Sequence, residues 1–314
     1  MTRKSAPTVL LSTPALDLLR PRLIAEYDLV GLWEPDFAAE AETARAIVVL
    51  GHEPLPPGLF DACPRLGLLA CFTSGYERLD VDGARARGVL VSHAPEVNPQ
   101  EVADHALGLI VASRRRIVLG DRLVRRAGWH DPETFRLSRS LRGAKVGIVG
   151  LGAIGRALAA RCVALGMEVR WWSPRRRDAE WPQATTLLDL AEWCDVLAVC
   201  ARADDSNRRL ISRDVLHSVG REGLLVNVAR GQLVDEDALI DLLRDGRLGA
   251  AALDVFDPEP TSAERWAGVD NAVLTPHVAG ATVESIEAMI ELLRLNLARF
   301  FADGAIVTPV PETP

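Results

Sequence analysis

Short apolar runs alternate with amphipathic segments along most of the chain. In the first hundred residues, the segment 14–26 places Leu16, Leu19, Leu23 and Ile24 at helical spacing. The apolar runs of this region lie at 8–12, 46–51, 66–72 and 88–94. A second series lies at 145–150, 168–172, 195–200, 223–229, 249–256 and 271–276. Short apolar runs that alternate with helices predict two parallel β-sheets, each in an α/β domain.

Two longer segments predict helices between and after these series. Residues 101–128 follow the irregular connection at Pro95 and Pro99, and their pattern fits one long helix or a broken pair that enters the second domain. Residues 283–301 predict an amphipathic helix. Its apolar face is formed by Ile286, Met289, Ile290, Leu293 and Leu297.

Composition narrows the class of protein. A chain of 314 residues, 48 % hydrophobic and 25 % charged, is typical of a folded protein with two domains. Its net charge of −7 gives no basic field for nucleic acid, which we therefore do not expect as a partner. No run of about 18 apolar residues predicts a membrane span. The five cysteines include no CxxC pair, and with the interrupted N-terminal apolar run they predict a soluble cytoplasmic protein.

The segment "KVGIVGLGAIGRALAARCVALG" joins a buried strand to a GxGxxG turn and then to a helix. The glycines of the turn are Gly150, Gly152 and Gly155. Glycines at this spacing allow a tight turn and close approach of a pyrophosphate, which the N–H groups at the start of the helix can bind. A tight crossover without a ligand is the alternative. The strand–turn–helix–strand context favours a dinucleotide site.

The position after the next strand distinguishes between the two nicotinamide dinucleotides. An NAD site usually has Asp or Glu about 20 residues after the glycine turn, where the carboxylate binds the ribose 2′-OH. Twenty-one residues after Gly152 the chain has Ser173, in "WWSPRRR". Ser173, Arg175 and Arg176 can bind a 2′-phosphate, so NADP(H) is favoured and NAD(H) stays open. The alternative is a solvated arginine turn, with Asp178 or Glu180 folding back to the ribose.

Polar residues follow three further strands of the second series. They are Arg230 in "NVARG", Asp254 and Glu259 in "LDVFDPEP", and His277 in "TPHVAG". Because the carboxyl ends of parallel strands line the ligand crevice, these side chains are expected beside the cofactor. Arginine can bind a carboxylate through two hydrogen bonds, and a histidine beside a glutamate can exchange a proton with a carbonyl oxygen. This set is suited to a keto acid. No cluster of ligands at metal-binding spacing is present in the sequence.

Almost from end to end, the chain resembles the D-2-hydroxyacid dehydrogenases. This family includes glyoxylate/hydroxypyruvate reductases, D-lactate dehydrogenases and phosphoglycerate dehydrogenases. The resemblance rests on "FTSGYERLDV", "SLRGAKVGIVGLGAIGR", "NVARGQLVDEDALIDLL", "DVFDPEP" and "TPHVAG". It implies that Arg230 binds the substrate carboxylate and that Glu259 pairs with His277, the acid in reduction and the base in oxidation. It further implies that the backbone around Ser74, Gly75 and Tyr76 contacts the carboxylate.

The resemblance also implies the cofactor contacts and the domain organisation. Asp254 would hold the nicotinamide carboxamide. The full set of expected cofactor contacts is Gly150, Gly152, Ala153, Ile154, Gly155, Ser173, Arg175, Arg176, Cys200, Ala229, Asp254, His277 and Gly280. Two doubly wound domains, Rossmann-like or flavodoxin-like, would enclose a cleft, with a substrate domain at 1–97 plus 288–314 and an NAD(P) domain at 98–287. Homodimers would form through the NAD(P) domain.

One departure from the family and two alternatives accompany this interpretation. The chain lacks the usual proline-containing stretch after the strand 195–200, which leaves the cofactor contacts at 200–203 open. The expected reaction is reduction of a small 2-keto acid, such as glyoxylate or hydroxypyruvate, to the D-2-hydroxy acid with NADPH. An NAD-dependent D-lactate or D-3-phosphoglycerate dehydrogenase is one alternative. A dinucleotide-sensing scaffold is the other, although a scaffold has no chemical need for Arg230, Glu259 and His277 together.

Overall fold

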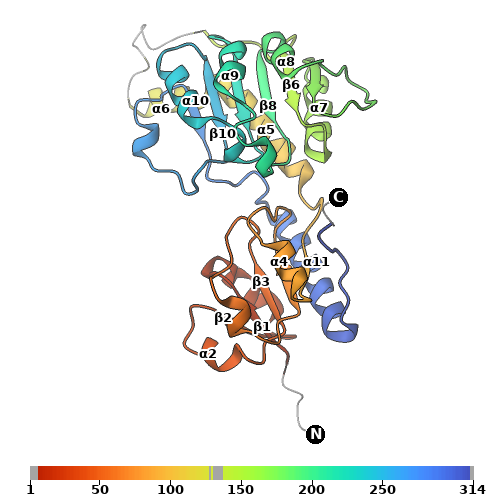
Figure 1. Cartoon of the computed structure of the whole chain (residues 1–314). Helices are drawn as coiled ribbons and strands as arrows, with labels where there is room; N and C mark the ends of the chain where they lie inside the picture. Colours follow the sequence, from red (N-terminus) through yellow and green to blue (C-terminus); the bar gives the residue numbers. More distant parts are fainter. Residues whose placement is uncertain (1–5, 127–128, 130–136, 312–314) are drawn as a thin grey trace. The chain divides into compact units, whose positions relative to one another are not determined.

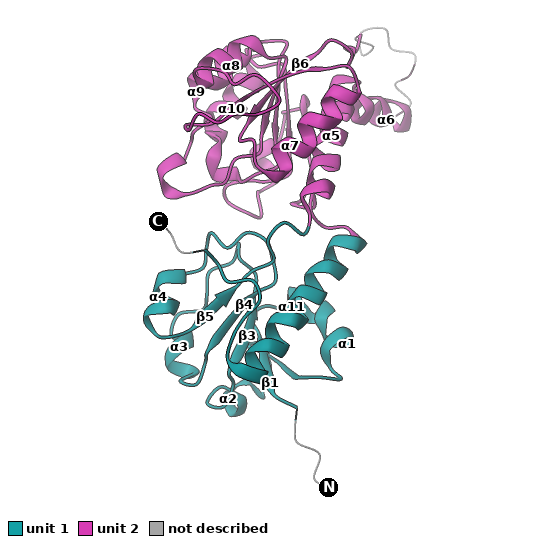
Figure 2. Ribbon diagram, turned by 90° about the vertical axis from the view of Figure 1, so that its right-hand side faces the viewer, with its two compact units in different colours: residues 1–97, 283–314 teal, residues 98–282 magenta. Residues whose placement is uncertain are grey.

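The computed structural model describes residues 6–126, 129 and 137–311, and the chain forms two compact units. Unit 1 comprises residues 1–97 and 283–314, and unit 2 comprises residues 98–282 (Figures 1 and 2). The sequence placed the second boundary at residue 288. The structure places it at 283 because a continuous helix, α11 (Val283–Asp303), begins there and packs as one piece in unit 1.

Unit 1 is built on a five-stranded parallel sheet. Its strands are β1 (Thr8–Leu11), β2 (Asp28–Gly31), β3 (Ala46–Val49), β4 (Leu68–Cys71) and β5 (Leu90–Ser92). Their order is β2-β1-β3-β4-β5, which is the flavodoxin-like order. Four of the strands confirm the apolar runs. The sequence analysis missed β2, in which Asp28 and Gly31 flank only two apolar side chains, Leu29 and Val30.

Helices cover both faces of this sheet. One face packs against η1 (Pro14–Leu19), α1 (Arg20–Leu23) and α11. The other packs against residues of α3 (Leu59–Ala62) and α4 (Val81–Ala86), while α2 (Phe37–Glu40) lies next to β2. The segment 14–26, whose apolar residues have helical spacing, is helical over Pro14–Leu23 but not as one continuous α-helix. Pro21 has no N–H to donate, so the segment divides into a 3₁₀ helix and one α-helical turn.

Unit 2 contains a six-stranded parallel sheet. Its strands are β6 (Lys145–Val149), β7 (Glu168–Trp172), β8 (Val196–Val199), β9 (Leu224–Asn227), β10 (Ala250–Leu253) and β11 (Ala272–Leu274). Their order is β11-β10-β9-β8-β6-β7. β7 lies on one side of β6 and β8 lies on the other, so the order of strand addition reverses between β6 and β8. Ligands bind at such a switch point, outside the carboxyl ends of the strands.

The helices of unit 2 form two layers around two apolar cores. One core lies under α5 (Pro99–Arg114) and α7 (Ala153–Ala164). The other lies under α8 (Leu187–Trp193), α9 (Arg213–Val219) and α10 (Glu236–Arg244). Within the described residues, the long segment 101–128 forms a broken pair of helices. Helix α5 ends at Arg114, and α6 (Ile117–Arg125) begins after Arg116, whose φ is +54°. Residues 127–128 lie outside the described residues.

Candidate active site

The glycine turn after β6 has the geometry of a dinucleotide site. Gly150 has a φ of +92°, and a Cβ there would lie 2.6 Å from the Cα of Ala201. A Cβ on Gly155 would lie 2.2 Å from the carbonyl oxygen of Gly150. A Cβ on Gly152 would meet nothing within 4 Å. Two glycines therefore serve close packing, whereas the third leaves open space at the first turn of α7, where N–H groups can bind a pyrophosphate.

The residues around this turn complete the edge of the sheet at the switch point. Ala153 and Ile154 form the start of α7, directly after the open position of Gly152. Cys200 continues β8, and its N–H donates to the carbonyl of Val149 over 2.8 Å. Burial raises the pKa of the Cys200 thiol to about 12, so this thiol is unreactive. The arrangement therefore fits a bound dinucleotide, with the segment after β8 packed against the glycine turn.

The arginine turn lies directly after β7. Ser173 Oγ donates to the carbonyl of Arg175 over 2.7 Å. The side chains of Arg175, Arg176 and Arg177 are exposed, and no ion pair is recorded for any of them within the described chain. Cations that form no ion pair with a neighbouring carboxylate keep their attraction for an external anion. To bind that anion, the Ser173 hydroxyl has to turn away from Arg175.

An Asx-type turn at the end of β9 positions Arg230. Asn227 is buried, and its Oδ1 accepts from the N–H of Ala229 at 3.0 Å while its Nδ2 donates to the carbonyl of Arg230 at 3.0 Å. A Cβ on the following residue, Gly231, would lie 2.0 Å from the carbonyl carbon of Phe256. The turn that carries Arg230 is thus packed directly on the loop that follows β10. Sequence reasoning did not single out Asn227.

The structure brings Glu259 and His277 together as a hydrogen-bonded pair. His277 Nδ1 lies 2.8 Å from Glu259 Oε2, and the two side chains are 32 % and 28 % exposed. The other carboxylate oxygen, Oε1, accepts from the backbone N–H of Phe256 over 2.9 Å. The glutamate is therefore fixed from its own loop, and it orients the imidazole ring through Nδ1.

Asp254 organises the backbone that carries His277. Its carboxylate is buried and accepts from the N–H groups of Val278 (3.0 Å) and Ala279 (2.9 Å) and from the hydroxyl of Thr275 (2.5 Å). The N–H of His277 donates to the Asp254 carbonyl over 2.8 Å. His277 has a φ of +53°, a strained value for this residue type that the surrounding hydrogen bonds stabilise. A carboxylate offers about four acceptor positions, so Asp254 can accept one more donor.

His105 of α5 supports this network from the helix layer. Its Nε2 lies 3.0 Å from Thr275 Oγ1 and 3.5 Å from Asp254 Oδ1. Sequence reasoning assigned no role to His105, because its position in mid-helix carries no signal of this contact. At the end of the same segment, a Cβ on Gly280 would lie 2.2 Å from Asn98 Nδ2, so a larger residue there would displace the Asn98 side chain.

The expected substrate loop belongs to unit 1, after β4. Thr73 Oγ1 accepts from the N–H of Gly51 (3.0 Å) and donates to the carbonyl of Gly75 (2.9 Å). Ser74 Oγ donates to the carbonyl of Ala94 over 2.6 Å. The backbone of this loop is therefore held by its own side chains, as a site built from backbone N–H groups requires.

A buried histidine supports the same loop. His93 Nδ1 lies 3.0 Å from the carbonyl of Ser74, and the rings of Tyr76 and His93 make an edge contact at 5.1 Å. The sequence left His93 without a role because its partners are distant along the chain.

Comparisons with known proteins decide the family. A family model for the NAD binding domain of D-isomer specific 2-hydroxyacid dehydrogenases matches residues 107–279. Glyoxylate/hydroxypyruvate reductase A of Arabidopsis thaliana is 36 % identical over 308 residues, which cover 96 % of this chain and 98 % of that protein. The chain belongs to the D-isomer specific 2-hydroxyacid dehydrogenases. The predicted family is confirmed.

Two further relatives agree with this assignment. The 2-ketogluconate reductase of Gluconobacter oxydans is 36 % identical over 316 residues, covering 98 % of this chain and 99 % of that one. An NADPH-dependent glyoxylate/hydroxypyruvate reductase from Sinorhizobium meliloti, solved with NADP and malonate, is 36 % identical with a TM-score of 0.87 and covers 98 % of this chain and 97 % of that chain. The predicted fold class, two parallel-sheet α/β domains, is confirmed.

Two searches of the described residues concern other kinds of site. Within 6–126, 129 and 137–311, no group of three or more His, Cys, Asp or Glu side chains is placed to hold a metal ion. The helices that the structure describes include none with the length and apolar character of a membrane span.

Glu236, at the start of α10, is a buried carboxylate of this dehydrogenase that sequence reasoning did not single out. Its Oε1 accepts from the N–H of Asp257 over 2.7 Å, and its Oε2 lies 3.3 Å from Arg265 Nε. Burial raises the pKa of Glu236 to about 7, although the Asp257 N–H and the Arg265 guanidinium act to lower it. Glu236 therefore fixes the loop on which Glu259 lies. At neutral pH the negative charge of the Glu236 carboxylate is unfavourable.

This pKa predicts a pH dependence of stability that the variant Glu236→Gln removes. The folded chain binds the Glu236 proton more tightly than the unfolded chain, so the wild type loses stability as the pH rises through about 7. As the pH rises from 5 to 8, the free energy of unfolding of the variant should increase by roughly 1–2 kcal/mol relative to that of the wild type, as measured by urea unfolding. Asp237→Asn, on the exposed neighbour that also binds Arg265, should show no such gain. If the free energy of unfolding changed with pH in the same way in the wild type and in Glu236→Gln, the pKa of Glu236 would not be raised.

Proposed function

We propose that the dehydrogenase reduces small 2-keto acids to D-2-hydroxy acids with NADPH, and that glyoxylate and hydroxypyruvate are its leading substrates. The observation that carries this proposal is the Glu259–His277 pair at 2.8 Å, on loops that follow β10 and β11. The named activities of the Arabidopsis and Sinorhizobium relatives support these substrates. The Gluconobacter relative makes 2-ketogluconate a second candidate.

The proposed roles of the side chains are those that the family resemblance implies, and the Glu259–His277 contact supports them. Arg230 binds the substrate carboxylate through its planar guanidinium, and backbone N–H groups around Ser74, Gly75 and Tyr76 add further donors. Since Nδ1 of His277 is held by Glu259, Nε2 donates the proton to the substrate oxygen. The carboxylate of Glu259 stabilises the imidazolium before the transfer.

The cofactor supplies the hydride at its nicotinamide C4 when it is bound. Asp254 offers its remaining acceptor position to the carboxamide, and the glycine turn with the start of α7 binds the pyrophosphate. Ser173, Arg175 and Arg176 bind the 2′-phosphate. An NAD-dependent D-lactate or D-3-phosphoglycerate dehydrogenase would use the same catalytic pair, but the arginine turn is less suited to its cofactor. The five cysteines, all among the described residues, are free thiols, which supports a reducing cytoplasmic location.

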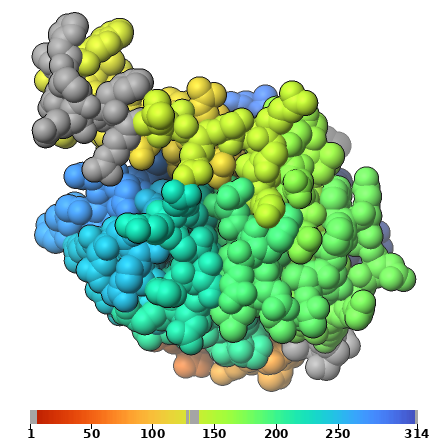
Figure 3. Space-filling view, turned by 90° about the horizontal axis from the view of Figure 1, so that it is seen from above, coloured from red at the N-terminus to blue at the C-terminus, as the bar shows by residue number. Residues whose placement is uncertain are grey.

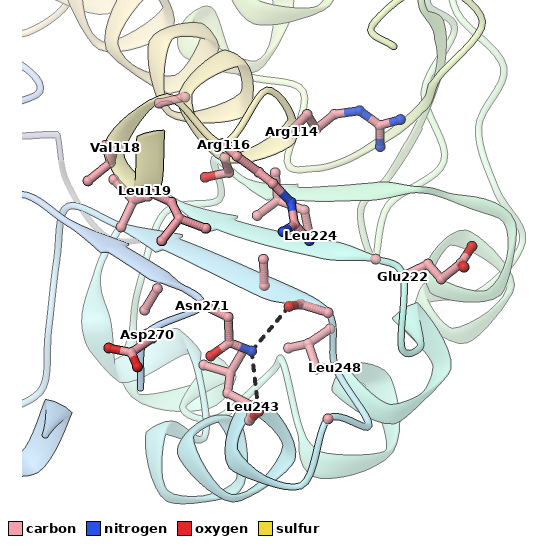
Figure 4. Close-up of a pocket in the computed structure, with 18 of the residues that line it drawn as sticks. Arg114, Arg116, Val118, Leu119, Glu222, Leu224, Leu243, Leu248, Asp270 and Asn271 are labelled. Atoms are coloured by element: carbon pink, nitrogen blue, oxygen red, sulfur yellow. Dashed lines mark hydrogen bonds between the residues drawn. The ribbon is translucent and has the colours of Figure 1, made fainter. Parts of the chain in front are cut away.

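A homodimer through unit 2 is also proposed. A groove of about 820 Å³ opens at the amino ends of β9, β10 and β11, on the edge of the sheet opposite the glycine turn. Its wall includes Val118 and Leu119 of α6, and on its floor Asn271 Nδ2 donates to the carbonyls of Leu243 and Gly249 (Figure 4). In the space-filling view α6 stands out at the rim of this face (Figure 3).

The exposed apolar residues of α6 give this proposal its test. Ile117 and Val124 are each 54 % exposed, and an apolar surface that projects beside a groove is typical of a self-association site. Light scattering should therefore give about twice the chain mass of 34.1 kDa, and the double variant Ile117→Asp/Val124→Asp should give the monomer. A wild type that is monomeric at micromolar concentrations would contradict the proposal.

The acid/base role predicts a large loss of turnover in His277→Ala. The wild type should oxidise NADPH with glyoxylate, hydroxypyruvate or 2-ketogluconate, and the variant should lose roughly 100-fold or more of kcat because the proton donor is gone. His217→Ala, on an exposed histidine of α9, is the matched control and should keep wild-type turnover. Near wild-type kcat for His277→Ala would remove His277 from the mechanism. No oxidation of NADPH or NADH with any of the three acids would refute the proposed substrates.

The arginine turn predicts the cofactor preference. The double variant Arg175→Ala/Arg176→Ala loses two cationic contacts to the 2′-phosphate, so its KM for NADPH should rise roughly 10- to 100-fold while its KM for NADH changes little. Arg177→Ala should have a smaller effect, because Arg177 lies further along the turn from Ser173 than Arg175 and Arg176 do. Steady-state kinetics with both cofactors would measure this. An unchanged NADPH-to-NADH preference in the double variant would show that the turn does not bind the phosphate.

A further inference from the structure

The chain returns to the edge of β7 immediately after the arginine turn. The N–H of Trp171 donates to the carbonyl of Pro182 (3.1 Å), and the N–H of Ala184 donates to the carbonyl of Trp171 (2.8 Å), which makes a parallel bridge between Trp171 and Gln183. The indole Nε1 of the buried Trp171 donates to the carbonyl of Trp181 over 2.9 Å. Residues 181–184 therefore occupy the place of a further strand outside β7 and are anchored there.

The anchored segment carries a side chain that spans the arginine turn. Gln183 Nε2 donates to the carbonyls of Arg175 (3.1 Å) and Ser173 (3.4 Å), and its Oε1 accepts from the N–H of Arg177 (3.2 Å). A side-chain amide has one acceptor oxygen and two donor hydrogens, and this orientation matches all three backbone groups. A single neutral side chain thus holds the backbone of residues 173–177 from a fixed point on the sheet.

The Arg175 carbonyl accepts from two donors, and only one of them is proposed to bind the cofactor. It receives the Ser173 hydroxyl at 2.7 Å and Gln183 Nε2 at 3.1 Å. When the Ser173 hydroxyl turns to an anionic oxygen, it gives up the bond to Arg175. Gln183 keeps its own bond, so the carbonyl stays satisfied and the turn keeps its shape. Without Gln183, the same movement of Ser173 would leave the Arg175 carbonyl with neither of these two donors.

We propose that Gln183 is a positioning residue that determines cofactor specificity: it holds the arginine turn in the shape that receives the 2′-phosphate, and it frees Ser173 to bind that phosphate. This inference rests on the proposed preference for NADP(H). Gln183 is uncharged and is not proposed to touch the phosphate. Gln183 acts by ordering the turn before the cofactor binds. A flexible turn would have to be ordered on binding, and that cost would lower the affinity for NADP(H).

The test is the variant Gln183→Ala, assayed with NADPH and with NADH. Its KM for NADPH should rise roughly three- to tenfold, the cost of ordering one or two side chains, while its KM for NADH stays within about twofold. Calorimetric titration should show the same loss with 2′,5′-ADP and no loss with ADP. Equal losses for both cofactors, or no loss for either, would overturn the proposal, because a merely structural role would affect NADPH and NADH alike.

Two controls separate this inference from the proposal on which it rests. Gln100→Ala removes a glutamine elsewhere in unit 2, which accepts from Arg161 Nη1 at 3.0 Å, and should leave both KM values unchanged. Adding Gln183→Ala to Arg175→Ala/Arg176→Ala should raise the KM for NADPH by less than Gln183→Ala alone does in the wild type, because only the Ser173 contact remains to be positioned. If the wild type has no NADPH preference, the cofactor proposal fails. If Arg175 and Arg176 set the preference but Gln183→Ala leaves it intact, only the role of Gln183 fails. Gln183→Met, similar in volume, replaces Gln183→Ala if that variant does not fold.

Discussion

The carboxylate of Asp254 is the interaction on which the active site depends most. It accepts from the N–H groups of Val278 and Ala279 and from the Thr275 hydroxyl, and these contacts hold His277 at a backbone angle that such a residue rarely adopts. From that position the imidazole reaches Glu259, which is fixed in turn by the N–H of Phe256. Loss of the carboxylate would leave buried donors unsatisfied and release the strained segment. The proposed catalytic pair of Glu259 and His277 therefore depends on a buried network at the end of β10.

The parallel sheet of unit 2 provides the frame for this network. Its strands all end at one edge, so the turns after β6, β9, β10 and β11 meet there although they are far apart in sequence. Close backbone packing at Gly150, Gly155 and Gly231 keeps the turns in place. The groove at the opposite edge shares none of these turns. Cofactor binding and the proposed self-association thus use separate ends of the same strands.

The sequence predicted the elements whose signal is local. Buried strands appear as apolar runs, GxGxxG is contiguous, and the resemblance gives the order Arg230, Glu259, His277. It missed β2, which has only two consecutive apolar side chains, and it did not divide η1 from α1 at Pro21. The supporting residues escaped for another reason. His105, Glu236 and Gln183 act through contacts that only the folded chain creates, and nothing near them in the sequence marks those contacts. Asn227 alone had a local signal, since asparagine before a turn commonly bonds the backbone two or three residues ahead.

The most direct test of the account follows the hydride itself. The purified chain is given hydroxypyruvate and NADPH that carries deuterium at both hydrogen positions of nicotinamide C4, and the product is examined by mass spectrometry and chiral chromatography. The account predicts D-glycerate with one deuterium, bound to C2, because the hydride passes directly to the keto carbon while His277 protonates the oxygen. L-glycerate, or glycerate without deuterium, would contradict it.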